Sequence, residues 1–110
     1  MKVRLIKKQS IENYIETNNQ SLAGFESWFN IMKNADWINP LDIIKSFNSA
    51  DILGNGTNRV VFNIGGNKYR MICEYFFGFK KVHLYVTWIG THAEYTELCR
   101  QGRQYKINDY

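Results

Sequence analysis

Residues 59–77 read RVVFNIGGNKYRMICEYFF, and this stretch decides the fold. Two runs rich in β-branched and aromatic residues, which favour strands, flank the dipeptide Gly65-Gly66. Glycines at that place favour a hairpin, because the two-residue turns that join antiparallel strands need positive φ angles. In such a turn Ile64 faces Asn67, and Phe62 faces Tyr69. The stretch therefore predicts two antiparallel strands joined at the glycines.

A third strand follows after a second, looser turn at residues 78–81, because residues 82–89 again carry a strand pattern. Pairing Phe77 with Val82 makes a three-strand meander in which alternate side chains share a face. One face is then apolar and carries Val60, Phe62, Ile64, Tyr69, Met71, Cys73, Tyr75, Phe77, Leu84, Val86 and Trp88. The opposite face carries Arg59, Asn63, Lys68, Arg70, Glu74, His83, Tyr85 and Thr87. We expect helices to cover the apolar face and the other face to stay open.

The N-terminal half has a different pattern. Val3–Ile6 alternates apolar and charged residues, as a short edge strand does, and Ser10, Ser21 and Asn39-Pro40 are start signals of three helices. Residues 51–58 are dense in turn formers and predict a loop. We therefore predict a single α+β domain over residues 1–110. Its antiparallel sheet combines a short N-terminal strand with the three-strand meander, and its helices pack on one face.

The composition limits the class of protein. The chain has 110 residues and a net charge of +4, which is compatible with a nucleic acid or an acidic protein as partner. Nothing resembles a signal peptide or a membrane span, so we expect a cytoplasmic protein with no membrane partner. The two cysteines, Cys73 and Cys99, form no CxxC pair and predict no disulfide.

Four residues that can carry chemistry gather at one end of the predicted sheet. Lys68 and Arg70 lie on the open face near the Gly65-Gly66 turn, and the third strand returns to that edge at Thr91-His92. Tyr95 follows within reach. Two cations beside an imidazole and a phenol suit an RNA phosphodiester, because the cations favour the added negative charge of a pentacoordinate transition state. Histidine can transfer a proton near neutral pH.

This cluster also has an ordinary explanation. A lysine and an arginine on an open strand face are often only solvated charge, and a histidine after a strand is often a turn residue. Tyr95 suits a core position as well as a site. We expect no cofactor and no metal, because the acidic residues are dispersed and His83 and His92 share no ligand-like spacing with the cysteines.

A family resemblance favours the chemical interpretation. The run VVFNIGGNKYR at residues 60–70 resembles the central signature of the HigB toxin family, and THAEY at residues 91–95 resembles its second signature. The region from Ala35 to Asp51 is similar to the middle of the family, so the likeness covers nearly the whole chain. The chain departs from the pattern after Tyr95, where Thr96 replaces a common Asp, and residues 99–105 are less diagnostic.

The resemblance implies a RelE-like fold and an mRNA interferase that usually acts at the ribosome. The 2′-hydroxyl of the message would attack its own phosphate and leave a 2′,3′-cyclic phosphate and a 5′-hydroxyl. Carried over to this sequence, the implied catalytic group is Lys68, Arg70, His92 and Tyr95. The implied partner is a HigA-like antitoxin with a helix-turn-helix domain, and operator DNA would be bound only through that antitoxin. The alternative is a non-catalytic RNA-binding regulatory module on the same scaffold.

Further RNA contacts are expected from polar and basic side chains on the open face and at the second turn. These are Arg59, Asn63, Lys80, Lys81 and His83.

Overall fold

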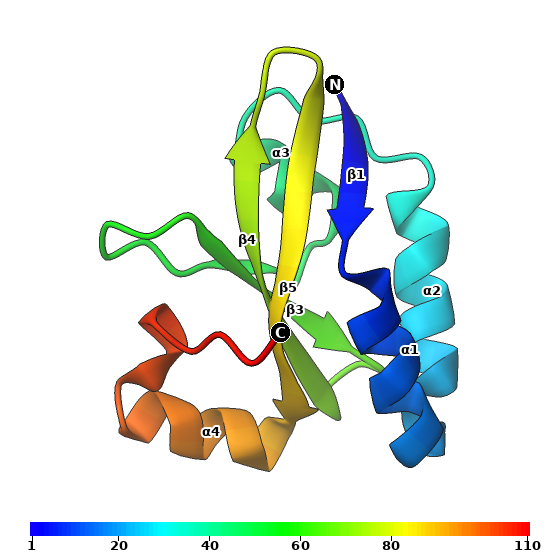
Figure 1. Ribbon diagram of the computed structural model, residues 1–110, viewed down its shortest axis with the longest axis vertical. Helices are drawn as coiled ribbons and strands as arrows, with labels where there is room; N and C mark the ends of the chain where they lie inside the picture. The colour runs from blue at the N-terminus through cyan, green and yellow to red at the C-terminus, as the bar shows by residue number, and fades with distance from the viewer.

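The computed structural model describes all 110 residues and contains one five-stranded sheet with helices on it (Figure 1). The elements in chain order are β1 (Lys2–Ile6), α1 (Lys8–Thr17), the 3₁₀ turn η1 (Asn19–Ser21), α2 (Leu22–Met32), α3 (Leu41–Ser46), β2 (Asp51–Ile52), β3 (Arg59–Ile64), β4 (Tyr69–Phe77), β5 (Lys81–Thr91), α4 (His92–Arg100) and the 3₁₀ turn η2 (Arg103–Tyr105). The predicted α+β class is confirmed. No helix has the length and apolar character that a membrane span requires.

The sheet is mixed, so the prediction of a wholly antiparallel sheet was wrong. Its strand order is β1-β5-β4-β3-β2, and the edge strand β1 runs parallel to β5, with Leu5 opposite Leu84. The short strand β2, at Asp51–Ile52, lies within the stretch that we expected to be a loop. Because α1 to α3 carry the chain from one sheet edge to the other, β1 is free to pair in either direction, and its residue pattern specifies none.

The β3–β4 hairpin keeps the predicted faces but has a different turn. Residues 65–68 form a four-residue turn, with Gly65 at φ 64° and Gly66 at φ 68°, so Ile64 pairs with Tyr69 rather than with Asn67. The register thus differs from the predicted one by two residues. Since side chains alternate with a period of two, every side chain of the hairpin stays on its predicted face.

The β4–β5 hairpin begins in the predicted register and then departs from it. Phe77 pairs with Val82, as predicted, but the register shifts between Ile72 and Cys73, and Thr87 is the extra residue of a β-bulge. Beyond the bulge the faces exchange. Trp88 therefore lies on the face opposite the one we predicted, and Ile89 takes its place in the main core.

Helices pack on both faces of the sheet, which corrects the prediction of helices on one face. Beneath α1, α2 and α3 lies the main core of 18 buried residues, including Phe25, Phe62 and Cys73. On the other face Val61, Ile72 and Trp88 pack with Leu98 of α4 and Ile107 of the C-terminal segment. Cys73 and Cys99 are both unpaired.

The small core around Val61, Ile72 and Trp88 covers part of the sheet face that we expected to stay open. We predicted no helix at residues 92–100, although Thr91 and Glu94 carry a start signal for one. The Thr91 Oγ1 accepts the Glu94 N–H at 3.1 Å, and the Thr91 N–H donates to the Glu94 carboxylate at 2.8 Å. This capping box, with the spacing T-x-x-E, satisfies two backbone donors at the start of α4.

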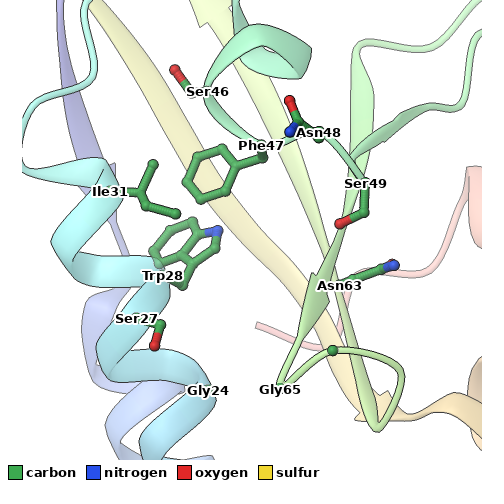
Figure 2. Close-up of a pocket in the computed structure, with 11 residues that line it drawn as sticks. Gly24, Ser27, Trp28, Ile31, Ser46, Phe47, Asn48, Ser49, Asn63 and Gly65 are labelled. Carbon is green, nitrogen blue, oxygen red and sulfur yellow. The ribbon is translucent and has the colours of Figure 1, made fainter.

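The helix α2 approaches the β3–β4 turn at a glycine. A Cβ added at Gly24 would lie 2.5 Å from the backbone nitrogen of Gly65. Figure 2 shows the two glycines facing each other across this contact. The absence of a side chain at Gly24 thus lets the helix lie directly against the turn.

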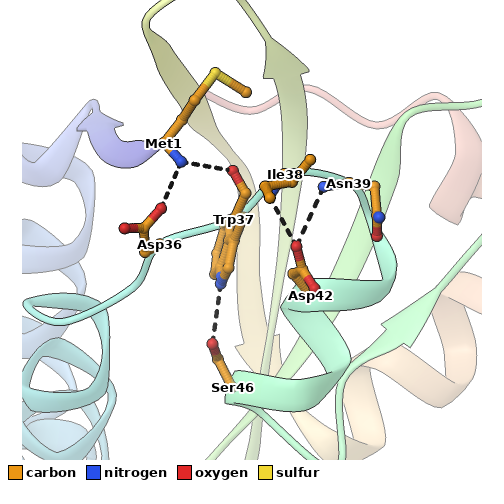
Figure 3. A network of polar contacts seen from close by, with 7 residues as sticks. All are labelled: Met1, Asp36, Trp37, Ile38, Asn39, Asp42 and Ser46. Atoms are coloured by element: carbon orange, nitrogen blue, oxygen red, sulfur yellow. Dashed lines mark hydrogen bonds and ion pairs between the residues drawn. The ribbon is translucent and has the colours of Figure 1, made fainter.

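Polar contacts join the chain before α3 to its neighbours (Figure 3). The Asp42 carboxylate accepts the Ile38 N–H at 2.8 Å and the Asn39 N–H at 3.3 Å, and the Ile38 bond is the main cause of the lowered pKa of Asp42. The Trp37 Nε1–H donates to Ser46 Oγ at 2.9 Å.

Only one of the three predicted helix caps forms. Asn39 Oδ1 accepts the Leu41 N–H at 3.0 Å, as a cap does, although α3 begins at Leu41 and Pro40 takes the N-cap position that we predicted for Asn39. Ser10 lies inside α1, which begins at Lys8, and the Ser21 hydroxyl donates to Asn18 O instead of capping α2.

The contact at Gly24 generates a prediction with an internal control. Helix propensity alone makes Gly24→Ala stabilising and the neighbouring exposed change Ala23→Gly destabilising by about 1 kcal/mol. Because an added Cβ meets the Gly65 backbone, we expect Gly24→Ala also to destabilise, by about 1 to 3 kcal/mol. Urea unfolding of both variants measures this, and a gain of stability in Gly24→Ala would contradict the close contact.

Candidate active site

The β3–β4 turn and the start of α4 lie side by side, although 23 residues separate Lys68 from His92 in the sequence. Tyr69 pairs with Thr91 across the β4–β5 ladder, and the His92 N–H donates to the Lys68 carbonyl at 2.9 Å. Both side chains are exposed at this place. The predicted return of the third strand to Lys68 is therefore confirmed.

Arg70 is buried, which corrects the prediction that it lies open on the sheet. Its side chain is only 8% exposed. One guanidinium nitrogen donates to the Tyr69 carbonyl at 3.0 Å, and another donates to Asn67 Oδ1 at 2.7 Å. The guanidinium is therefore held in one orientation. Asn67 is not among the site residues predicted from the sequence, because only its place in the turn relates it to Arg70.

His92 is the first residue of α4 and is exposed. The capping box fixes the direction in which the helix leaves β5, and so fixes where His92 stands. The dipole at the start of a helix favours negative charge nearby. An imidazole at this place is accessible to a bound phosphate and to solvent.

Tyr95 lies one helical turn after His92 and is half-buried. Its ring packs against Trp88 with a centroid distance of 6.0 Å, which places it over the sheet face that bears Arg70. Burial, with a smaller effect of the neighbouring Cys99, raises the pKa of Tyr95 above its ordinary value, and the charge of Arg70 partly opposes this rise. The phenol is therefore protonated at neutral pH and can donate a proton or a hydrogen bond.

The expected RNA-contacting residues lie at three separate places. Asn63 pairs with Arg70 across the β3–β4 ladder and so lies beside the cluster. Arg59 is 4% exposed, and its guanidinium donates to Glu74 at 3.1 Å and to the Gln104 carbonyl at 3.0 Å. Two of its three guanidinium nitrogens are therefore engaged within the protein.

Lys80, Lys81 and His83 lie at the other end of the sheet. The 11-residue strand β5 separates Lys81 from Thr91, beside His92, by about 30 Å at the usual rise per residue. In the register with β1, Lys2 lies opposite Lys81, and Arg4 lies opposite His83. These cations form a second basic surface, distant from His92.

No group of three or more His, Cys, Asp or Glu side chains lies together in a way that could hold a metal ion. The candidate side chains at the junction of β4, β5 and α4 are two cations, an imidazole and a phenol. The cations suit an anionic substrate, and the imidazole and the phenol can transfer protons during its reaction.

Comparisons with known proteins identify the family of the chain. Residues 22–98 match the model of the HigB toxin family, described as the RelE-like toxic component of a toxin–antitoxin system. The chain is 25% identical over 104 residues to a protein named mRNA interferase HigB from Escherichia coli O6:H1 (strain CFT073). That alignment covers 94% of this chain and 99% of the relative. The chain belongs to the HigB toxin family, and its partner is accordingly an antitoxin.

Proposed function

We propose that this toxin is a metal-independent endoribonuclease that cleaves messenger RNA. The observation that carries the proposal is the junction at Lys68 and His92, which brings the four candidate catalytic side chains to one end of the sheet. The name of the relative from E. coli supports the same substrate.

In the proposed reaction the 2′-hydroxyl of the message attacks the adjacent phosphorus. A 2′-O–P bond forms, the P–O5′ bond breaks, and the products are a 2′,3′-cyclic phosphate and a 5′-hydroxyl. Arg70, held by Asn67 and the Tyr69 carbonyl, stabilises the charge of the phosphorane, and Lys68 holds the phosphate. His92 takes the proton of the 2′-hydroxyl, and the protonated Tyr95 supplies one to the leaving oxygen.

The cations at Lys80, Lys81 and His83 form the second basic surface and would bind an RNA backbone. Because this surface is far from the site of cleavage, only a large RNA would reach both. This arrangement suits a message that is cut while the ribosome holds it. The proposed antitoxin is HigA-like, carries a helix-turn-helix domain, and connects the toxin to operator DNA in the cytoplasm. A gene for such a protein beside this one would support that pairing.

The alternative is a non-catalytic RNA-binding module, and translating ribosomes distinguish the two. Only the enzyme leaves new 5′-hydroxyl ends on the message. A protein that binds RNA and stops growth without producing such ends would establish the alternative instead.

The first prediction for the site concerns Lys68 and Arg70. Lys68→Ala and Arg70→Ala should each lower the cleavage rate on the order of 100-fold, because each removes a cation from the transition state. Lys68 is exposed, so Lys68→Ala should change stability by less than about 0.5 kcal/mol. Arg70→Ala also removes buried hydrogen bonds and should lower the melting temperature.

The matched control is Lys45→Ala, which removes an exposed lysine from α3 and should cut at the wild-type rate. If Lys68→Ala cuts as fast as this control, Lys68 is not part of the site.

A double mutant tests whether His92 and Arg70 serve one reaction. Residues that act on the same transition state give non-additive losses. We expect His92→Ala combined with Arg70→Ala to be much less impaired than the product of the two single effects, measured as cleavage rates on translating ribosomes. Strictly multiplicative losses would mean that the two residues act independently.

Chelation tests the absence of a metal requirement. Cleavage should persist in EDTA at a concentration that leaves ribosomes intact by sedimentation, because the proposed nucleophile and the charge stabilisation come from the RNA and from basic side chains. Complete loss of cleavage with intact ribosomes, restored by added magnesium, would show that the mechanism needs a metal.

A further inference from the structure

A pocket with no charged residue lies beside the candidate active site. It has a volume of about 390 Å³ and lies between α2, the chain after α3 and the outer edge of β3 (Figure 2). Hydroxyl and amide side chains line much of it, among them Ser27, Asn48 and Ser49. Gly65 and Gly66 also line it, and they belong to the turn that carries Lys68. The pocket and the catalytic cluster therefore share one turn.

A buried hydrogen-bond donor in this pocket has no partner. Trp28 is only 2% exposed, and its Nε1–H makes no hydrogen bond. The corresponding group of Trp37 does have a partner, Ser46 Oγ at 2.9 Å. Figure 2 shows the indole nitrogen of Trp28 on the side of the ring turned toward Asn63 and Ser49. Because unsatisfied buried donors are costly and rare, this one suggests an acceptor that arrives with a ligand.

The outer edge of β3 adds an unpaired backbone donor and acceptor. The Leu53 N–H donates to the Arg59 carbonyl, so the backbone groups of residues 59, 61 and 63 point away from β4. Arg59 and Val61 meet β2, whose pairing with β3 ends at Val61. Asn63 makes no backbone hydrogen bond on that side and none through its side chain. Its N–H and C=O are free at the rim of the pocket.

These features fit a nucleobase better than a strand of another protein. Asn63 is the one residue at this strand edge with a free N–H and a free C=O. One donor and one acceptor can pair with the polar groups of a nucleobase, but they are too few to hold an added β-strand. A base is neutral and is recognised by amide, hydroxyl and N–H groups, which are the groups present here. Asn63 lies opposite Arg70 in the ladder, so a phosphate at the cations would leave a neighbouring base near the pocket.

We propose that this pocket binds one base of the substrate RNA, next to the phosphate that is cut, and that Trp28 Nε1–H donates to it. The proposal rests on the proposed function for the identity of the substrate. The pocket then determines which nucleotide is preferred beside the cleavage site, whereas the catalytic cluster acts on a phosphate that every nucleotide has.

The direct test observes the indole N–H signals by NMR. The chain has three tryptophans, so Trp28→Phe identifies the signal of Trp28 by its loss. The probes are short single-stranded oligonucleotides with 2′-O-methyl groups, which cannot be cleaved by attack of the 2′-oxygen, in four versions that differ in base. We expect at least one version to shift the Trp28 signal while the Trp37 signal stays in place. This readout requires no cleavage, so it separates a failure of the pocket from a failure of the nuclease.

Two α2 variants provide the matched comparison. Ser27 is exposed and lines the pocket, so Ser27→Phe should fill it, whereas Ala23→Phe adds the same ring on the same helix outside the pocket lining. Ser27→Phe should abolish the NMR shift, alter the nucleotide preference of mapped cut sites and lower kcat/KM. Trp28→Phe should lower kcat/KM about threefold to tenfold, as for the loss of one neutral hydrogen bond. Ala23→Phe should match the wild type.

Two results would overturn the proposal. One is an unmoved Trp28 signal with all four oligonucleotides at saturation of the protein, and the other is an unchanged cut-site preference in folded Ser27→Phe. In the first case, a Trp28 shift produced by the antitoxin would assign the pocket to a protein contact.

Discussion

The β-bulge at Thr87 is the feature on which the candidate site depends. Thr87 is buried, and its hydroxyl donates to the Ile72 carbonyl at 2.9 Å, which stabilises the extra residue of β5. The bulge sends Trp88 to one face of the sheet and Ile89 to the other. Trp88 then provides the apolar surface against which Tyr95 of α4 packs. Without the exchange of faces α4 would lack its main support, and His92 would have no fixed position.

The residues around the bulge are adjusted to this arrangement. A Cβ added at Gly90 would lie 2.5 Å from the Trp88 ring, so the glycine makes room for the indole. Thr91 and Glu94 then cap α4 at once. The segment from Thr87 to Glu94 therefore turns the end of a strand into the start of a helix within a few residues. The signature T-H-x-E-Y combines this structural role, carried by its Thr and Glu, with the candidate chemistry of its His and Tyr.

Burial gives the two cations of the cluster different characters. Arg70 is enclosed and held by Asn67 and by the backbone, so in the proposed reaction it would need little reorganisation as charge develops on the phosphate. Lys68 is exposed on the turn, so in the proposed reaction it could follow a phosphate as it binds. One cation is therefore preorganised and the other adaptable. This difference follows from α4 and the C-terminal segment, which cover part of the face that bears Arg70.

The sequence by itself determined the α+β class, the meander and the face of nearly every strand residue. It did so because alternation survives a register change of two residues, which is why a wrong turn length at Gly65-Gly66 still placed Phe62 and Asn63 correctly. It also placed Lys68 beside Thr91-His92, since a meander must return to the same edge. The helix at residues 92–100 was within reach of the sequence, through the T-x-x-E spacing.

Only the tertiary structure decided the rest, because these features depend on contacts between distant segments. The parallel pairing of β1, the bulge at Thr87 and the burial of Arg70 leave no periodic mark in the chain. The unpartnered Trp28 donor is of the same kind, since a tryptophan in an apolar helical stripe looks like any core residue. Local pattern specifies which face a residue takes, whereas packing decides what covers that face.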